Sequence, residues 1–198
     1  MSTKIICGFP GSGKTKYYKD WSQYSPENVW RRGNNGEQVY NNLGFPCGEK
    51  IIDLDYRDYM WIKSDDKTEK SLNPDFPSNY INKIKEYMET EGIIFISTHN
   101  EVRKALENEG IPYTIILPTK DMKEMYTWRY EYYKENKDND PNYKEVLEYI
   151  NENWDELITE LENDNYGSHV YLSSKYINYE YITNSIIDDI IPSYEVEE

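Results

Sequence analysis

"KIICGFPGSGKTKYY", residues Lys4 to Tyr18, predicts a strand, a glycine-rich loop and the first turns of a helix in immediate succession. The apolar run before the loop is typical of a buried strand. The loop matches the pattern G-x-x-x-x-G-K-[ST] at each fixed position, with Gly8, Gly13, Lys14 and Thr15. A turn that only reversed the chain would not need a lysine and a threonine at set places, so the pattern indicates a bound ligand.

The residue types of this loop suit a phosphate group. Glycines let backbone N–H groups turn inward, and the helix that follows adds a positive partial charge at its N-terminus. The lysine supplies a mobile cation for the β- and γ-phosphates, and the threonine hydroxyl reaches Mg²⁺. We therefore expect a nucleoside triphosphate, ATP, and Mg²⁺ to bind here, with contacts from Gly8, Phe9, Pro10, Gly11, Ser12, Gly13, Lys14 and Thr15.

Five apolar runs along the chain predict five strands. Several of them are apolar at consecutive positions, as expected for strands that are covered on both faces. Helical patterns separate the runs, and crossovers of this length predict a parallel sheet in a three-layer α/β fold. The runs are KIICGF (4–9), KIIDLD (50–55), GIIFIS (92–97), YTIILP (113–118) and HVYLS (169–173).

Two of the intervening helices carry end signals. The stripe over residues 80–88 predicts a helix that stops at Gly92, which is a suitable C-terminal cap. In THNEVRKALENEG, Thr98 and Glu101 form the pattern of a capping box, and Gly110 is a stop signal. The segment DDKTEKSLNPDFPS, residues 65–78, reads as a polar loop.

The segment KDMKEMYTWRYEYYKENKD, residues 120–138, places an arginine within an apolar helix face. A guanidinium among apolar groups needs an anionic partner or must extend past them to water. Arg129 is therefore expected either to contact the triphosphate or to pair at the surface with Glu124 or Glu131. Its neighbours on the predicted face are Met122, Met125, Tyr126, Tyr132 and Tyr133.

Length and charge limit the classes of protein that fit. The chain has 198 residues, which suits one domain over residues 1–198, ending in an acidic tail at about 192–198. A formal net charge of −15 argues against a general nucleic-acid binder, although a local basic groove stays open. No long apolar stretch or signal-like start is present, so we expect no membrane contact and a cytoplasmic location (the host cytoplasm for a viral protein).

Carboxylates end the second predicted strand. Asp53 and Asp55 in IIDLDYRDY fall where ligands bind in open α/β sheets. Such carboxylates can hold the shell of Mg²⁺ or accept a proton from an attacking hydroxyl. Asp55 is our preferred base and Asp53, together with Thr15, the metal ligand, although both carboxylates share one face. Arg57 is expected to pair with these carboxylates or to touch substrate.

The third predicted strand ends in FISTHN without the aspartate that often orients Mg²⁺ there. Metal binding is therefore assigned to the second strand. His99 is expected to make an ordinary loop hydrogen bond, with ligand contact as the alternative. Arg103 is left open between a substrate anion and solvent. For a phosphate acceptor, the candidate anchors are Arg31, Arg32, Arg57 and Arg103.

Together these features resemble the nucleoside and nucleotide kinase group of P-loop proteins, which has the adenylate-kinase-like fold. The texture of FPSNYI, IIFISTHNEVRKAL and IPYTIILP is similar to small kinase-like ATP-binding proteins of large phages and viruses. The resemblance implies a P-loop NTPase fold with strand order 2-3-1-4-5 and a mobile helical lid around residues 120–142. D-x-D also resembles small-molecule kinases, and DLDYR resembles, with altered spacing, phage-type polynucleotide 5′-hydroxyl kinases.

The function expected is an ATP- and Mg²⁺-dependent phosphotransferase that acts on a nucleotide, a nucleoside or a similar small molecule. The catalytic residues would be Lys14, Asp55, Asp53 and Arg129. One alternative is a kinase of a nucleic-acid hydroxyl, which the net charge disfavours. Another is an ATP-binding module with little transfer activity.

Overall fold

The structure is a computed structural model that describes residues 3–24, 50–63, 70–89, 92–136, 141–173, 186–187 and 190. The expectations for Arg31, Arg32 and the acidic tail at 192–198 lie outside these residues. Near the start of the chain, strand β1 (Lys4–Gly8) leads through a short loop into helix α1 (Lys14–Tyr24).

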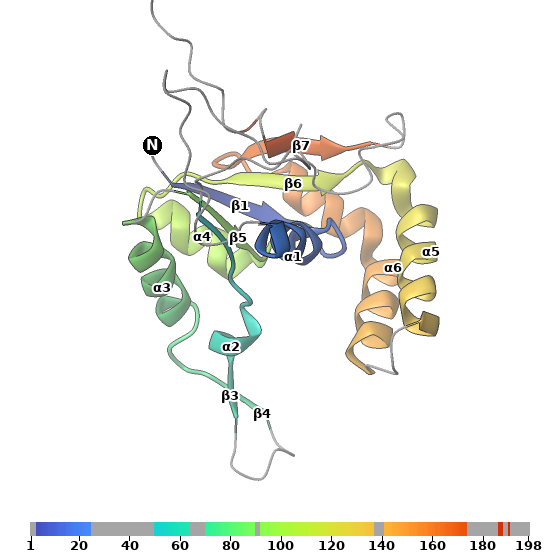
Figure 1. The fold of residues 1–198 in the computed structure, drawn as a ribbon, viewed down its shortest axis with the longest axis horizontal. Coiled ribbons are helices and arrows are strands. Elements are labelled where there is room, and N and C mark those ends of the chain that lie inside the picture. The colour runs from blue at the N-terminus through green and yellow to red at the C-terminus, as the bar shows by residue number, and fades with distance from the viewer. Residues whose placement is uncertain are drawn as a thin grey trace, which may run out of the picture.

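A five-stranded sheet forms the centre of the fold, and all four of its strand pairs are parallel. Its strands lie in the order β2-β5-β1-β6-β7. If only the strands of this sheet are numbered along the chain, this order is 2-3-1-4-5. The five apolar runs predicted as strands are all confirmed. Besides β1, the strands are β2 (Lys50–Asp53), β5 (Gly92–Ile96), β6 (Thr114–Pro118) and β7 (Ser168–Leu172) (Figure 1).

Both faces of the sheet are covered at its central strands β1 and β5. Successive strand residues point to opposite faces, yet Ile5, Ile6 and Cys7 are all buried, and so is every residue of β5 after Gly92. This burial pattern is compatible with a three-layer α/β fold. Burial also raises the pKa of the Cys7 thiol, so this cysteine behaves as a small apolar residue of the core.

Helices follow the strands, as the sequence predicts. Two details of the predicted helix ends are wrong: Gly92 is the first residue of β5 and no cap, and α4 is preceded by His99 without a side-chain capping bond, so Thr98 is not its cap. Gly110 does stop α4, with a φ of 67°. These helices are α3 (Ser78–Met88), α4 (Asn100–Asn108), α5 (Lys123–Asn136) after the short helix η1 (Lys120–Met122), and α6 (Pro141–Glu162).

A small hairpin interrupts the predicted polar loop. After the short helix α2 (Arg57–Met60), strands β3 (Trp61–Lys63) and β4 (Lys70–Leu72) pair antiparallel. The hairpin extends away from the sheet (Figure 1). Ile62 and Leu72 are exposed on it, so it has little apolar burial of its own to mark it in the sequence.

Helices α5 and α6 lie side by side as a hairpin (Figure 1). The inward face predicted for residues 120–138 is correct for Met122 of η1 and Tyr126 of α5, which are buried, but wrong for Tyr132, which is exposed and stacks on Trp128. The side chain of Tyr133, predicted on the same face, lies outside the described residues. Helix α6 has a kink at Asn153, whose φ of −113° and ψ of 16° are not helical.

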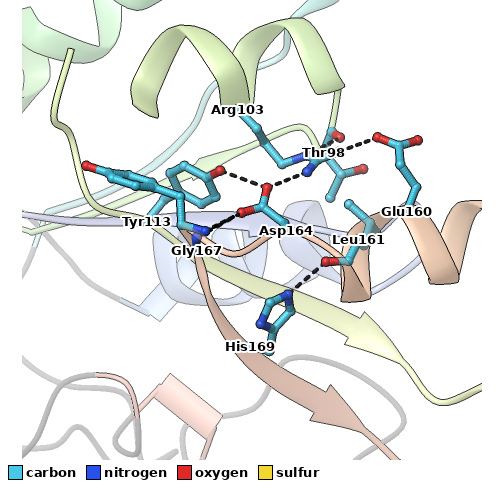
Figure 2. Close-up of polar contacts among 9 residues, drawn as sticks. Thr98, Arg103, Tyr113, Glu160, Leu161, Asp164, Gly167 and His169 are labelled. Carbon is cyan, nitrogen blue, oxygen red and sulfur yellow. Dashed lines mark hydrogen bonds and ion pairs between the residues drawn. The ribbon is translucent and has the colours of Figure 1, made fainter. Parts of the chain in front are cut away.

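A buried ionic cluster fixes the end of α6 to α4 (Figure 2). The Arg103 guanidinium donates to Asp164 and to Glu160, and its Nε donates to the Thr98 carbonyl oxygen at 3.1 Å. The Tyr113 hydroxyl donates to Asp164 at 2.8 Å. Burial raises the pKa of Asp164, but hydrogen bonds to its carboxylate outweigh that effect and the net pKa lies below the usual value. Arg103 is therefore neither at a substrate nor in solvent, contrary to both alternatives drawn from the sequence.

Replacing Arg103 by Met should lower the free energy of unfolding by about 3–5 kcal/mol, because Asp164 would remain buried without its cation. Lys85→Met is the matched control, since Lys85 and Glu109 form an ion pair whose side chains are 41% and 47% exposed. That surface pair should be worth less than about 1 kcal/mol. Denaturant unfolding of both variants measures the difference, and similar losses would show that the cluster is not a structural anchor.

Candidate functional site

The loop between β1 and α1 has the backbone shape that the glycine spacing predicts. Gly11 and Gly13 have φ values of 76° and 97°, which only glycine adopts without strain. The Phe9 N–H donates to the Ile116 carbonyl oxygen at 2.8 Å, and the Ser12 N–H donates to the Phe9 carbonyl oxygen at 3.0 Å. The first bond ties the start of the loop to β6, and the second closes a turn within the loop.

Gly8 is required by a close approach of side chains. A Cβ atom at this position would lie 2.7 Å from both Cγ and Cδ of Lys14 and 2.9 Å from Oγ of Ser12. The Lys14 stem therefore folds back over Gly8, and its ammonium donates to the Gly8 carbonyl oxygen. Burial lowers the pKa of Lys14, and the neighbouring Asp53 opposes that effect.

Ser12 adds a second sign of a ligand site. Its side chain is fully buried, and its hydroxyl oxygen has no hydrogen-bond partner among the described residues. An unsatisfied buried hydroxyl is costly in a folded protein. A phosphate oxygen in the loop would be a suitable acceptor for it.

The start of α1 is bonded to the end of β2. The Thr15 hydroxyl donates to Oδ2 of Asp53 at 2.6 Å, although the two residues are 38 positions apart. Hydroxyl and carboxylate oxygens are the ligands that Mg²⁺ prefers, usually with one or two carboxylates plus phosphate oxygens. No cluster of three or more His, Cys, Asp or Glu side chains that could hold a metal occurs in the described part of the chain. The donor set thus fits Mg²⁺ held jointly with phosphates.

Asp55 has a different partner, although it lies only two residues further on. Nε of Arg57 lies 3.0 Å from Oδ1 and 2.9 Å from Oδ2, and the Arg57 N–H also donates to Oδ1 at 3.0 Å. Burial raises the pKa of Asp55, but the hydrogen bonds from Arg57 outweigh it and the net pKa is lowered. The pairing expected for Arg57 is confirmed.

The end of β5 lies between the end of β2 and the end of β1, because β5 is paired with β2 on one side and β1 on the other. His99 follows this strand end, and its Nδ1 lies 3.0 Å from Oγ of Ser97. The imidazole also contacts the ring of Tyr56, with 4.0 Å between ring centroids. The hydrogen bond expected for His99 is present, but sequence reasoning missed Tyr56 because its ring contact joins residues 43 positions apart.

An aromatic cluster joins the loop to the α5–α6 hairpin. Phe9 packs edge-on against Tyr126 of α5 and Trp154 of α6, at centroid distances of 5.8 and 5.6 Å. Trp154 donates from Nε1 to the Lys120 carbonyl oxygen at 3.0 Å. The base of the predicted lid at residues 120–142 is therefore part of the same core as the loop.

Arg129 lies one turn beyond Tyr126 and is 4% exposed. Its guanidinium lies over the Tyr126 ring, 5.0 Å from the centroid, and Nη2 is 3.5 Å from Sδ of Met125. The expectation of a surface arginine is therefore wrong. Contact with a triphosphate stays a prediction.

No protein-family model matches this chain, and neither a curated protein nor a solved structure matches it. None of the helices in the described ranges is long and apolar enough to cross a membrane.

Gly8→Ala should abolish binding of ATP while leaving most of the fold intact, because the added Cβ displaces Lys14 and Ser12 from the loop. Gly110→Ala is the control: its φ of 67° makes alanine strained, but no atom lies within 4 Å of the added Cβ. The control should lose stability and keep its ATP affinity. Calorimetric titration with ATP and Mg²⁺ compares the two, and unchanged affinity in Gly8→Ala would contradict this account of the loop.

Proposed function

We propose that this chain is an ATP- and Mg²⁺-dependent phosphotransferase. The observation that carries the proposal is the Thr15–Asp53 hydrogen bond at the end of a loop shaped by Gly8, Gly11 and Gly13. In P-loop proteins the loop threonine and a strand-end carboxylate share the metal, so a bond between the same two groups supports that identity here. The buried Ser12 hydroxyl, which has no hydrogen-bond partner among the described residues, adds independent support.

Each group of the loop has a definite task under this proposal. Backbone N–H groups of the loop and the N-terminus of α1 bind the phosphates. The ammonium of Lys14, which donates to the Gly8 carbonyl oxygen in this structure, would move to the β- and γ-phosphates when ATP binds. There its positive charge would stabilise the negative charge that shifts during transfer. Thr15 and Asp53 hold Mg²⁺, which when bound neutralises charge on the β- and γ-phosphates.

The acceptor binds, in this proposal, at the carboxyl ends of β2 and β5. Asp55 with Arg57, and Ser97 with His99, lie at these two strand ends. They offer hydrogen-bonding groups beside the loop, where ligands bind in open parallel sheets. A nucleoside, a nucleotide or a similar small molecule fits this arrangement. A nucleic-acid hydroxyl is the alternative acceptor, and a binding module without transfer is the alternative from another class.

The proposal is tested with Lys14→Ala and ATP. A panel of nucleosides, nucleoside monophosphates and 5′-hydroxyl oligonucleotides is incubated with ATP and Mg²⁺, and phosphorylated products are measured. The wild type should phosphorylate one class of acceptor, whereas Lys14→Ala should show no transfer and weaker ATP binding. Lys104→Ala is the control, since Lys104 is an exposed lysine of α4. Normal turnover in Lys14→Ala would refute a catalytic loop, and ATP binding without any transfer would favour the binding module.

Arg129 provides a second test, because its position beside Tyr126 places it one turn from the cluster that contacts Phe9. We propose that it donates to the transferring phosphoryl group. Arg129→Lys keeps the charge but loses the planar fork, so turnover should fall in both Arg129→Lys and Arg129→Ala. Turnover and ATP affinity are measured together at saturating ATP. If both variants turn over normally, Arg129 has only a packing role in α5.

A further inference from the structure

Three side chains at the ends of β2 and β5 have the chemistry to accept a proton from an acceptor hydroxyl. They differ in the hydrogen-bond partners that they already have. Asp53 accepts from Thr15. Asp55 is engaged through both carboxylate oxygens by Arg57. A carboxylate held in this way has to break a charge-assisted pair before it can take a proton. The sequence-based preference for Asp55 as the base therefore has a competitor.

His99 is the third group. Its Nδ1 bonds to the Ser97 hydroxyl, and its ring lies against Tyr56, so the imidazole is held at two points. Among the described residues no hydrogen bond reaches its Nε2. When Nδ1–H donates to Ser97, Nε2 carries the lone pair. The arrangement is that of a base with an orienting partner.

The strand order brings this imidazole to the reacting groups. The register pairs Asp53 with Phe95 and Cys7 with Ile96, so the residues after Ile96 leave the sheet between the end of β2 and the loop after β1. His99 thus follows the strand end that lies between the strand of the proposed metal ligand and the phosphate loop, and the charge of Lys14 acts on its imidazole.

We propose that His99 is the general base of the transfer and that the acceptor is a hydroxyl group, not a phosphate. This inference rests on the proposed phosphotransferase function. In the step, the acceptor O–H proton passes to Nε2 of His99 while the oxygen bonds to the γ-phosphorus of ATP. The bond between that phosphorus and the β–γ bridging oxygen breaks, ADP leaves, and His99 releases the proton to water.

The charges around the imidazole agree with this role. Burial lowers the pKa of His99; Glu101 of α4 and Glu160 of α6 raise it, while Lys14 and Arg103 lower it further. The net direction of the pKa is downward from 6.5, which favours the neutral imidazole, the form that can accept a proton.

The test uses the fact that the chain has only two histidines. His169 is the matched control, because its Nε2 contacts the Leu161 carbonyl oxygen at 2.8 Å, in the region of the Arg103 cluster (Figure 2). His99→Gln, His169→Gln and Ser97→Ala are compared with wild type for ATP affinity and for transfer to nucleosides, nucleoside monophosphates and 5′-hydroxyl oligonucleotides. Proton NMR follows the titration of the His99 ring, which is assigned by comparison with His99→Gln.

We expect transfer to a hydroxyl acceptor, with a loss of about 10²- to 10⁴-fold in turnover for His99→Gln and unchanged ATP affinity. Ser97→Ala should lose less, and His169→Gln should match wild type. Wild-type kcat/KM should rise with pH through the pKa that NMR assigns to His99, and this limb should vanish in His99→Gln.

Normal turnover in His99→Gln, or transfer to phosphates alone, would overturn the role of His99 and leave the phosphotransferase standing. A pH limb that does not follow the His99 titration would also overturn it. Absence of transfer to every acceptor would instead refute the proposed function itself, and this inference with it.

Discussion

The hydrogen bond between Thr15 and Asp53 is the constraint on which the site depends. It joins the first turn of α1 to the end of a strand that is separated from β1 by β5. The bond can form only if β2 and β5 end at the same level as the loop, which the parallel register provides. The sheet order therefore brings the end of β2 to the loop threonine, and it makes the end of β5, which His99 follows, the neighbour of both β2 and β1.

The loop is also tied to the core from its other side. Phe9, within the loop, is 1% exposed and packs edge-on against rings from α5 and α6. Such aromatic pairs contribute about 0.5–1.5 kcal/mol each beyond their burial. A change in the loop backbone would therefore alter the packing of Tyr126 and Trp154 at the base of the α5–α6 hairpin, next to Arg129. Helix α6 is kinked at Asn153, the residue before Trp154, whose ring packs against Phe9.

The local features of the fold could be predicted from the sequence, but its long-range partnerships could not. Short apolar runs identified all five strands of the sheet, several of them through consecutive apolar residues that are buried on both faces, as in β1 and β5, and the glycine spacing identified the loop. Arg103 was misjudged because its partner Asp164 is 61 positions away. The β3–β4 hairpin was missed because its residues bury little apolar area. At the site, the sequence could not predict that Asp53 pairs with Thr15 and Asp55 with Arg57, since the alternation of strand residues places both carboxylates on one face.

The central claim, that Thr15 and Asp53 form a magnesium-dependent triphosphate site, is tested most directly by titrating ATP into wild type and Thr15→Val with Mg²⁺ and with a chelator. Valine keeps the shape of threonine and removes the hydroxyl. Wild type should bind ATP much more tightly with Mg²⁺ than without it, and Thr15→Val should lose that difference while retaining the weaker metal-free binding. Equal affinity in all four titrations, or no ATP binding by wild type, would contradict the account.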